Sequence, residues 1–391
     1  MNADVAAAAP SPARGPALVF AVPCAAGLLF LPFLTVRPNR IVSGEPLHLW
    51  ETGQGAAGPA ATLVLLALAL APVLLRSRHW RAALAIAGIA ALMALAGMEA
   101  RARLAEAGEF ARVSLGGGFW LAIAFFGLAA ADAFMRMQLG PLARVGATAA
   151  AGAALLLALG SDWLASLSLL QEYRANAGTF ANAFRGHLLL VGGSLLPALA
   201  IGLPLGRLCH ASPRWRRAAL PVLNILQTTP SIAMFGLLMV PLAALVAAAP
   251  WLRDFGVAGI GATPAIIALT LYSLLPIVAN TVAGFGGVPA HSREAGRAMG
   301  MSRRALLMQV ELPLAAPVIL TGVRIVVVQN IGLAAVAALI GGGGFGTLVF
   351  RGMGQTAMDL VLLGALPIVG LAIAATVLLD AAIDLLRPGV R

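Results

Sequence analysis

Lysine is absent from this sequence of 391 residues, and all 26 basic residues are arginine. A Walker A loop needs a lysine that contacts the β- and γ-phosphates, and pyridoxal chemistry needs a lysine that forms a Schiff base. These 391 residues therefore exclude both enzyme classes, and they predict no catalytic residue. Cysteine is also scarce, because only Cys24 and Cys209 occur. Their wide separation predicts neither a disulfide nor a metal site.

Charged residues are also scarce. Only 10% of the residues are charged and 60% are hydrophobic, whereas an average soluble domain is about a quarter charged and about 45–50% apolar. Water-soluble cores cannot bury that much apolar surface, so the composition predicts an integral membrane protein surrounded by lipid. The net charge of +11 does not indicate a nucleic-acid partner, because the arginines are scattered between apolar stretches.

Long apolar stretches are abundant. About 20 apolar residues span the hydrocarbon core as a helix, and the mixture of Ala, Leu and Gly shows no barrel alternation. The sequence therefore predicts an all-α membrane protein with about ten transmembrane helices, the first a mature helix rather than a signal peptide. The predicted spans are 16–35, 58–75, 82–98, 117–135, 146–166, 186–206, 231–250, 263–283, 314–339 and 358–385.

The arginines predict the orientation of these spans. Sixteen of the 26 fall near the two ends or in alternate connections, around 76–81, 136–144, 207–217 and 293–304. The opposite connections hold nine arginines and most of the loop acids. By the positive-inside rule, both termini of this multi-pass protein are expected in the cytoplasm.

The sequence changes character near residue 175. Residues 1–175 are rich in alanine, contain two polar outer loops (36–57 and 99–116), and carry no recognisable motif. Residues 176–391 carry every sharp local pattern. We therefore predict an accessory N-terminal transmembrane module of about five helices, followed by a working domain of about five helices.

The connection 291–313 has its own helical signals. Ser292 is a good N-cap residue, and Glu294 would then lie in the first turn, where the helix dipole favours an anion. Gly300 suits a left-handed stop, Ser302 suits the cap of a second short helix, and Pro313 suits the start of the next span. The pattern predicts a basic helix–turn–helix that docks a partner at the cytoplasmic face.

At these residues the sequence resembles the inner-membrane permeases of binding-protein-dependent (type I) ABC importers. Their signature places Glu-Ala-Ala, a glycine, an aliphatic residue and Leu-Pro at fixed spacings. The one departure is Gly296, where the family usually has alanine, and it should loosen the first short helix. The positions that match are Glu294, Ala295, Gly300, Val310, Leu312 and Pro313.

This resemblance implies a C-terminal permease core whose residues 291–313 are the coupling loop, the element that seats in a partner ATPase. It also implies ABC ATPase subunits below, an extracytoplasmic solute-binding protein above, and a second permease copy or paralogue. No cofactor is expected on this chain, since the partner subunit uses the ATP.

Two further segments resemble the osmoprotectant branch of these permeases, which carries glycine betaine, choline and related quaternary ammonium compounds. They are residues 223–231 and 337–347, and the extra N-terminal helices resemble a longer variant in the same branch. The alternatives are an importer of another small solute, such as an amino acid or a sulfonate, and an ion-coupled secondary transporter. The secondary transporter would need intramembrane acids at the midplane, and no such pair is evident.

Polar residues at membrane depth are candidates for the translocation path, because placing a polar side chain there costs free energy. The alternative for them is hydrogen bonding between helices. A cage for a quaternary ammonium would need aromatic faces, and Tyr272, Phe235 and Phe285 do not form an evident one, which suits a permease whose specificity resides in the binding protein. The candidate path residues are Gln227, Thr228, Thr229, Asn280, Gln329 and Asn330.

Three remaining patterns have local explanations. The run 341–346 matches GxGxxG, but it follows an apolar span rather than a strand, so it predicts a flexible turn near a gate and not a dinucleotide site. Asp132 and Arg136 are spaced for an i, i+4 ion pair, as Asp384 and Arg387 are for i, i+3. Arg324, about ten residues into its span, is expected to snorkel, to pair with Asp380 or Asp384, or to stabilise one of two states.

Overall fold

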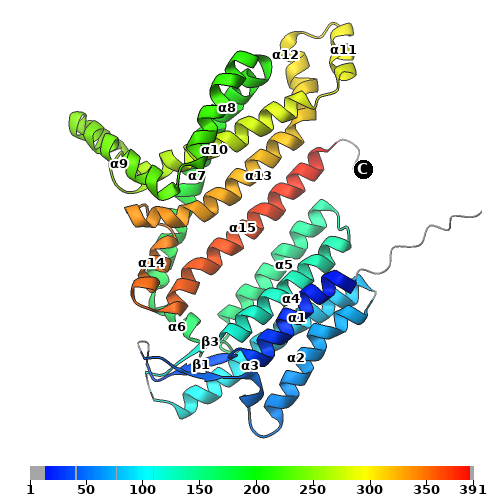
Figure 1. The fold of residues 1–391 in the computed structure, drawn as a ribbon, viewed down its shortest axis with the longest axis vertical. Helices are drawn as coiled ribbons and strands as arrows, with labels where there is room; N and C mark the ends of the chain where they lie inside the picture. Colours follow the sequence, from blue (N-terminus) through cyan, green and yellow to red (C-terminus); the bar gives the residue numbers. More distant parts are fainter. Residues whose placement is uncertain (1–13, 40–41, 76, 109, 388–391) are drawn as a thin grey trace, which may run out of the picture. The chain divides into compact units, whose positions relative to one another are not determined.

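The computed structural model describes residues 14–39, 42–75, 77–108 and 110–387. Contacts between residues divide the chain into two compact units, each mostly helical (Figure 1). The first unit comprises Met1–Gly140 and Ala151–Ala175, and the second comprises Pro141–Ala150 and Asn176–Arg391.

The first unit is built from hydrophobic helices that pack through small residues. Gly88 of α3 leaves room for the Phe126 ring of α4, because a Cβ at this glycine would lie 2.5 Å from a ring carbon. Leu28 and Leu92 are fully buried in the same core. The helices are α1 (Arg14–Phe30), α2 (Ala57–Leu74), α3 (Arg78–Glu106), α4 (Gly117–Arg136), α5 (Pro141–Gly160), whose first ten residues cluster with the second unit, and α6 (Ser168–Ala175).

A small antiparallel sheet lies where the sequence predicted polar loops. Its strands are β1 (Leu34–Arg37), β2 (Glu45–Leu47) and β3 (Arg112–Leu115), in the order β2-β1-β3. The prediction of a helix over 16–35 is wrong in its last residues, because α1 ends at Phe30. Pro32 disfavours the helical conformation in the residue before it, so the chain leaves the helix there.

The second unit contains the helices that will matter for function. A short 3-10 turn, η2 (Pro250–Phe255), and another, η4 (Ala337–Ile340), connect some of them, and a π-helical turn, η3 (Leu307–Glu311), precedes α13. The helices are α7 (Ala177–Ala211), α8 (Pro213–Thr228), α9 (Ser231–Ala248), α10 (Ala262–Gly286), α11 (Ala290–Ala298), α12 (Arg303–Leu306), α13 (Leu312–Val336), α14 (Gly346–Gly354) and α15 (Met358–Leu386).

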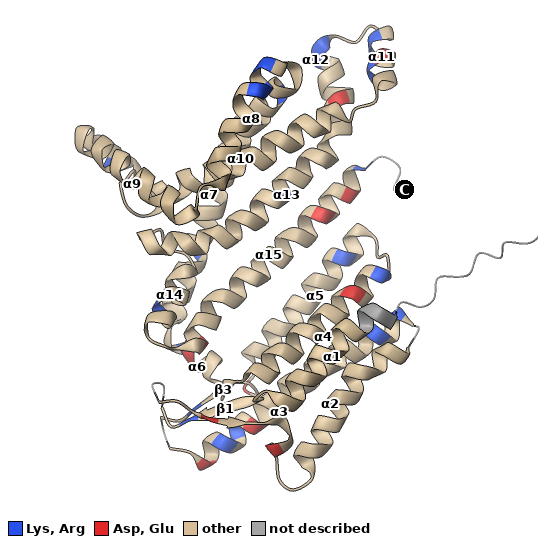
Figure 2. Ribbon diagram, viewed as in Figure 1, with Lys and Arg blue, Asp and Glu red and all other residues tan. Residues whose placement is uncertain are grey.

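Helix α8 corrects the sequence prediction, which treated residues 207–230 as a connection. It runs for 16 residues with Pro213 at its first position, where the missing N–H costs nothing. It ends at Thr228, since Pro230 keeps Thr229 out of the helical conformation. Its arginines gather at its beginning and its remainder is uncharged (Figure 2). The basic residues therefore marked only the first turn of a helix, not a loop.

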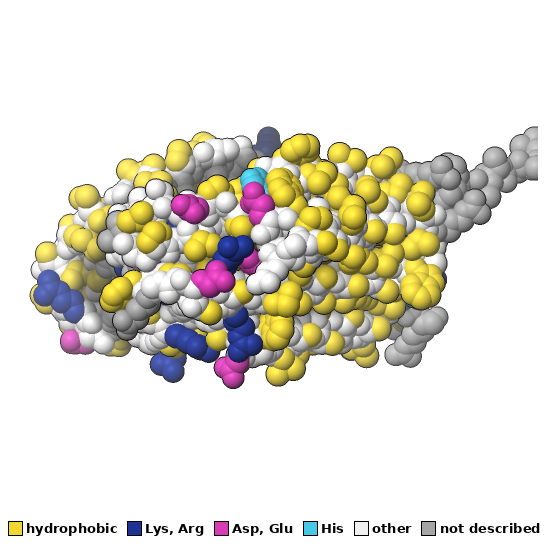
Figure 3. All heavy atoms as spheres, turned by 90° about the horizontal axis from the view of Figure 1, so that it is seen from below, with side chains coloured by type: hydrophobic (Ala, Val, Ile, Leu, Met, Phe, Trp, Pro, Cys, Tyr) yellow, Lys and Arg dark blue, Asp and Glu magenta, His cyan; other side chains and the backbone are white. Residues whose placement is uncertain are grey.

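Nine helices in the described part of the chain are long and apolar enough to cross a membrane, and Leu18–Phe30 is a shorter apolar helix. The all-α membrane class is confirmed. The remaining predicted span, 16–35, corresponds to this shorter helix. Hydrophobic side chains dominate the face shown in Figure 3, and the charged ones gather in one part of it.

Helix α10 is the central element of the second unit. It is the most deeply buried of the candidate spans, because 61% of the residues in its most apolar stretch are buried inside the protein. Small residues let its neighbours approach closely: a Cβ at Gly202 of α7 would lie 2.7 Å from Ile277, and one at Gly322 of α13 would lie 2.7 Å from Asn280. Such contacts between small and larger residues drive helix association in membranes.

Candidate functional site

Residues 291–313, the predicted coupling loop, form a helical hairpin at one end of the second unit (Figure 1). Helix α11 ends where Gly300 adopts a left-handed conformation with φ of +76°. The Met301 amide then donates to the Gly296 carbonyl at 3.1 Å. Ser302 caps α12, since its hydroxyl accepts a hydrogen bond from the Ala305 amide at 3.2 Å. The predicted conformation of Gly300 and the predicted cap at Ser302 are both confirmed.

Two details of the predicted loop are wrong. Helix α11 begins at Ala290 after Pro289, so Ser292 lies inside the helix and does not cap it. Glu294 consequently lies beyond the first turn. Pro289 is itself the N-cap residue, with φ of −59° and ψ of 137°, so the helix begins earlier than the serine signal suggests.

Gly296 has a packing role that the sequence did not reveal. It is buried, and a Cβ at this position would lie 2.6 Å from Leu306 and 3.3 Å from the Met301 sulfur. The glycine therefore allows the two short helices to close on each other. The departure from the family's usual alanine thus lies at the contact between α11 and α12.

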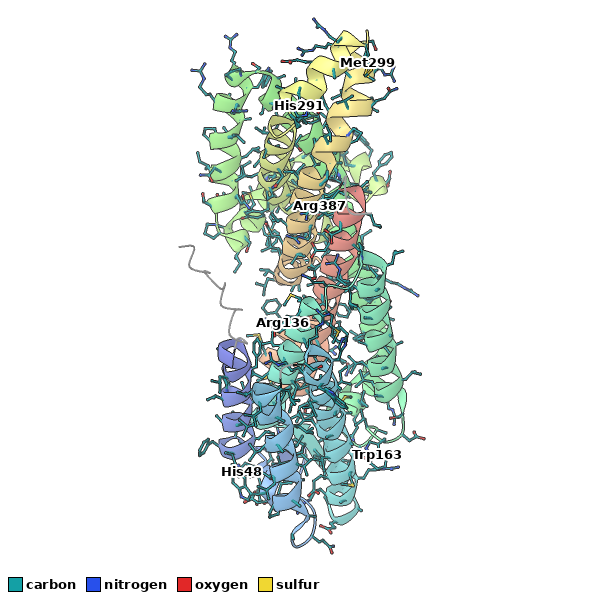
Figure 4. The ribbon with its side chains drawn as sticks, turned by 90° about the vertical axis from the view of Figure 1, so that its right-hand side faces the viewer. His48, Arg136, Trp163, His291, Met299 and Arg387 are labelled. Carbon is teal, nitrogen blue, oxygen red and sulfur yellow. The ribbon has the colours of Figure 1, made fainter. Side chains whose placement is uncertain are left out.

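The outer surface of the hairpin is exposed and mixed in character. Glu294 and Ala295 are exposed, and Met299 and Met308 have 72% and 55% of their surface accessible. Figure 4 shows His291 and Met299 on this hairpin. Exposed methionines are typical of surfaces that adapt to a partner. The last matching residues lie at the base: Val310 is half-buried in η3, and Leu312 and Pro313 begin α13.

The candidate path residues Gln227, Thr228 and Thr229 lie where α8 gives way to α9. The Thr229 carbonyl accepts a hydrogen bond from the Tyr272 hydroxyl at 2.6 Å. Tyr272 is near the middle of the 25-residue helix α10, so this break in the helical chain lies at membrane depth. Non-helical backbone is tolerated at that depth only within protein or beside a water-filled cavity.

Asn330 joins three helices. It is fully buried, and its side-chain amide donates to the hydroxyls of Ser194 in α7 and Ser273 in α10, each at 2.9 Å. The Thr270 hydroxyl in turn donates to the Ser194 carbonyl at 3.2 Å. Every polar group of this network is satisfied by protein, so the geometry favours hydrogen bonding between helices over an open path at Asn330.

The other two candidates differ from each other. The Asn280 amide donates to the Pro276 carbonyl of its own helix at 2.8 Å and packs against Gly322. It lies seven residues from Ser273, about 10 Å along α10. Gln329 is half-buried. Tyr272 and Ser273 thus bring the α8–α9 break and Asn330 to the same level of α10, while Asn280 lies apart from them.

Replacing Asn330 with alanine should destabilise the protein by about 1–2 kcal/mol, because the Ser194 and Ser273 hydroxyls lose their partner. The measurement is the thermal unfolding of the detergent-solubilised permease. Gln329→Ala is the matched control, since it alters the adjacent residue outside this network and should unfold like the wild type. Equal stability of the two variants would contradict the structural role of Asn330.

His187, which lies beside the glycine-rich run, was not among the predicted site residues. Its side chain is fully buried, and its Nε2 lies 3.0 Å from the Ile331 carbonyl. The Phe345 ring packs on it at 5.4 Å, and a Cβ at Gly344 would lie 3.1 Å from its Nδ1. The signal was available, since a histidine inside an apolar span is a polar group at membrane depth.

The glycine-rich run is a turn, as predicted. Gly341, Gly343 and Gly344 all have positive φ, between +75° and +83°. The run connects the 3-10 turn Ala337–Ile340 to α14, with no strand on either side. The expectation that GxGxxG here is not a dinucleotide motif is consistent with these neighbours.

The ionic predictions also have clear outcomes. Arg324 pairs with Asp380, which joins α13 to α15. Arg136 pairs with Asp132 at 2.8 Å, and Arg387 lies 3.6 Å from Asp384. Among the alternatives for Arg324, the structure therefore selects the pairing with Asp380.

Comparison with known proteins identifies both parts of the chain. A family described as "ABC transporter permease YehY, N-terminal domain" matches residues 13–170. A second, described as "Binding-protein-dependent transport system inner membrane component", matches residues 198–391.

Similar proteins include the osmoprotectant import permease protein OsmW of Salmonella typhimurium, 44% identical over 51% of this chain and 87% of that protein. The glycine betaine/carnitine/choline transport system permease protein OpuCD of Bacillus subtilis is 36% identical over 52% of this chain and 82% of its own length. Among solved structures, the MetNI methionine ABC transporter in an inward-facing conformation matches 54% of this chain and 97% of its own, at 20% identity and a TM-score of 0.48. The chain belongs to the binding-protein-dependent inner-membrane components, and it is the permease subunit of an ABC importer whose ATPase is a separate subunit.

Proposed function

We propose that this permease imports an osmoprotectant of the quaternary ammonium class, such as glycine betaine or choline. The observation that carries the proposal is the similarity of the second unit to permeases named for these solutes, at 36% and 44% identity. Residues 223–231 and 337–347, which resemble the same branch, form the α8–α9 break and the glycine-rich turn. The break contacts Tyr272 of α10, and the turn contacts His187 of α7.

The coupling loop is the proposed docking site of the ATPase. Binding-protein-dependent permeases work with an ATPase and a binding protein. The hairpin offers an adaptable surface of exposed Met299 and Met308 beside Glu294 and Ala295. It also begins the continuous helical segment Arg303–Ile340, which includes α13. Force applied at the hairpin is therefore delivered directly to α13, and alternation between inward-open and outward-open states follows.

Substrate recognition is proposed to reside in the binding protein. Tyr272, Phe235 and Phe285 are all buried, with at most 5% of their surface accessible. None of these three rings presents an open face to a quaternary ammonium, which is the contact that holds such a cation. A path without such a cage releases its solute easily.

The remaining parts of the proposal concern assembly. The working domain, residues 176–391, pairs with a second permease copy or paralogue in the inner membrane, and the coupling loop and both termini face the cytoplasm. Residues 1–175 form an accessory module. The positive-inside distribution of arginine supports this orientation.

The full complex should take up glycine betaine only when ATP and the binding protein are both present. Calorimetry should find betaine or choline affinity in the isolated binding protein and little in the isolated permease. The uptake measurement uses radiolabelled betaine in proteoliposomes, with ATP omitted in one control and binding protein in another.

Each contrary outcome points to a specific alternative. Uptake without ATP, or tight binding to the permease alone, would favour an ion-coupled secondary transporter. Transport of an amino acid or a sulfonate with none of betaine would keep the importer and remove the osmoprotectant assignment.

A further inference from the structure

A cluster at the base of the coupling loop connects three elements that the known signature does not link. The Arg207 guanidinium of α7 lies 3.4 Å from a carboxylate oxygen of Glu311. The same guanidinium lies over the Phe285 ring of α10, 5.0 Å from its centre. One turn further along α7, the His210 ring packs on Phe285 at 5.8 Å. The end of α7, the end of α10 and the base of the coupling loop therefore meet at one arginine.

Glu311 occupies an unusual backbone position. It is the last residue of the π-helical turn Leu307–Glu311, which stands between α12 and α13. π-Helical turns are rare and occur frequently at functional sites. The Glu311 side chain is mostly buried, at 12% exposure, so the ion pair is sheltered from the surrounding water on the carboxylate side. Its position lies between Val310 and Leu312, two residues of the signature.

The contacts on the two sides of this cluster differ in kind. Helices α10 and α13 are held together by backbone proximity, because a Cβ at Gly284 would lie 2.9 Å from the Ala315 carbonyl. Phe285 and Ala315 also share one apolar cluster with Ile319. At this level the Arg207 side chain adds a polar link from η3 to α7, beside Leu203 and Leu307, which pack against the same apolar cluster. A side-chain link of this kind can be removed without disturbing the packing of α10 against α13.

We propose that Arg207 is a positioning residue of the transport cycle, which transmits movement of the coupling loop to α7 and α10 through Glu311 and Phe285. The inference rests on the proposed docking of the ATPase at the coupling loop. When the hairpin moves, the helical segment that begins at Arg303 moves with it. Glu311 then pulls the guanidinium, and α7 follows. Arginine suits this role because its planar group binds a carboxylate and stacks on a ring at the same time.

The test compares four variants in the complete complex of permease, ATPase and binding protein in proteoliposomes. Glu311→Gln keeps the shape and removes the charge, and Arg207→Lys keeps the charge and removes the planar contact with Phe285. The double variant R207E/E311R restores an ion pair with reversed polarity. Asp132→Asn is the matched control, because it removes one carboxylate charge from an ion pair in the first unit, outside this cluster.

We expect Glu311→Gln and Arg207→Lys to co-purify with the ATPase as the wild type does, and to hydrolyse ATP. Betaine moved per ATP hydrolysed should fall at least about fivefold, the lower end of typical coupling between sites. The double variant should regain part of this ratio, and Asp132→Asn should keep the wild-type ratio. A purely structural role would lower the yield or the melting temperature of the complex without changing the ratio.

The experiment distinguishes failure of the proposed docking from failure of the role of Arg207. If the wild-type permease does not bind the ATPase, the proposed docking is wrong and this inference falls with it. If the wild type couples normally and both single variants keep its ratio, Arg207 does not transmit movement. If the single variants lose the ATPase altogether, the ion pair shapes the docking surface instead, which also overturns the inference.

Discussion

Replacing Gly300 with valine is expected to reduce ATP-dependent uptake about tenfold while membrane insertion remains normal. The residue has φ of +76°, and no atom lies within 4 Å of a Cβ placed there. The cost is therefore conformational and not steric. Forcing an L-residue into this region costs about 1–2 kcal/mol, and 1.4 kcal/mol is a factor of ten in an equilibrium. The strain is released by opening the joint between α11 and α12, which displaces the proposed docking surface.

The measurement for Gly300→Val is co-purification of the ATPase together with solute uptake. Gly300→Asn is the control at the same position, because asparagine tolerates the left-handed region better than other side chains. It should retain most of the uptake. Wild-type assembly and uptake by the valine variant would remove the coupling-loop assignment.

Much of the fold was predictable because a membrane imposes a strong and simple constraint. Among the residues that the structure describes, nine apolar stretches form helices long enough to span, since lipid leaves the backbone no alternative. Local backbone signals were equally reliable where one residue type determines the conformation. The left-handed Gly300 and the Ser302 cap are examples.

The predictions that failed depended on tertiary structure. The strand Leu34–Arg37 forms only because Leu115 and Leu47 lie opposite Leu34 in the sheet, and periodicity in one short segment cannot show that. Helix α8 was hidden because its basic first turn looked like a loop. The role of Asn330 required the positions of Ser194 and Ser273, 136 and 57 residues away.

In the candidate site, too, features set by local sequence could be predicted and features set by tertiary contacts could not. The exposed half of the coupling loop follows a linear motif and could be located from it. Gly296 and Arg207 could not be assigned from the sequence, because each acts through a neighbour distant in sequence or across a turn. His187 stands out in the sequence only as a polar residue in an apolar span, and its contacts with Ile331 and Phe345 required the structure. Buried contacts between helices are therefore where the structure adds most to the functional argument.

Replacing Gly346 with alanine should prevent the second unit from folding normally. Gly346 begins α14, and a Cβ there would lie 1.8 Å from the Ala335 carbonyl oxygen and 2.9 Å from the Ala338 Cβ. Real side chains do not approach a backbone oxygen so closely, so α14 or the end of α13 must move. The displaced segment carries Phe345, whose ring packs on Phe180 at 5.2 Å. We expect a loss of more than about 3 kcal/mol, beyond the usual cost of overpacking.

The same helix supplies the control for this variant. Gly354 ends α14, and no atom lies within 4 Å of a Cβ built there, so Gly354→Ala adds the same methyl group into open space. Size-exclusion profiles and melting temperatures of the two purified variants provide the measurement. Gly354→Ala should behave like the wild type, and Gly346→Ala should give little monodisperse protein. A normal profile and melting temperature for Gly346→Ala would show that α14 is not held against the end of α13.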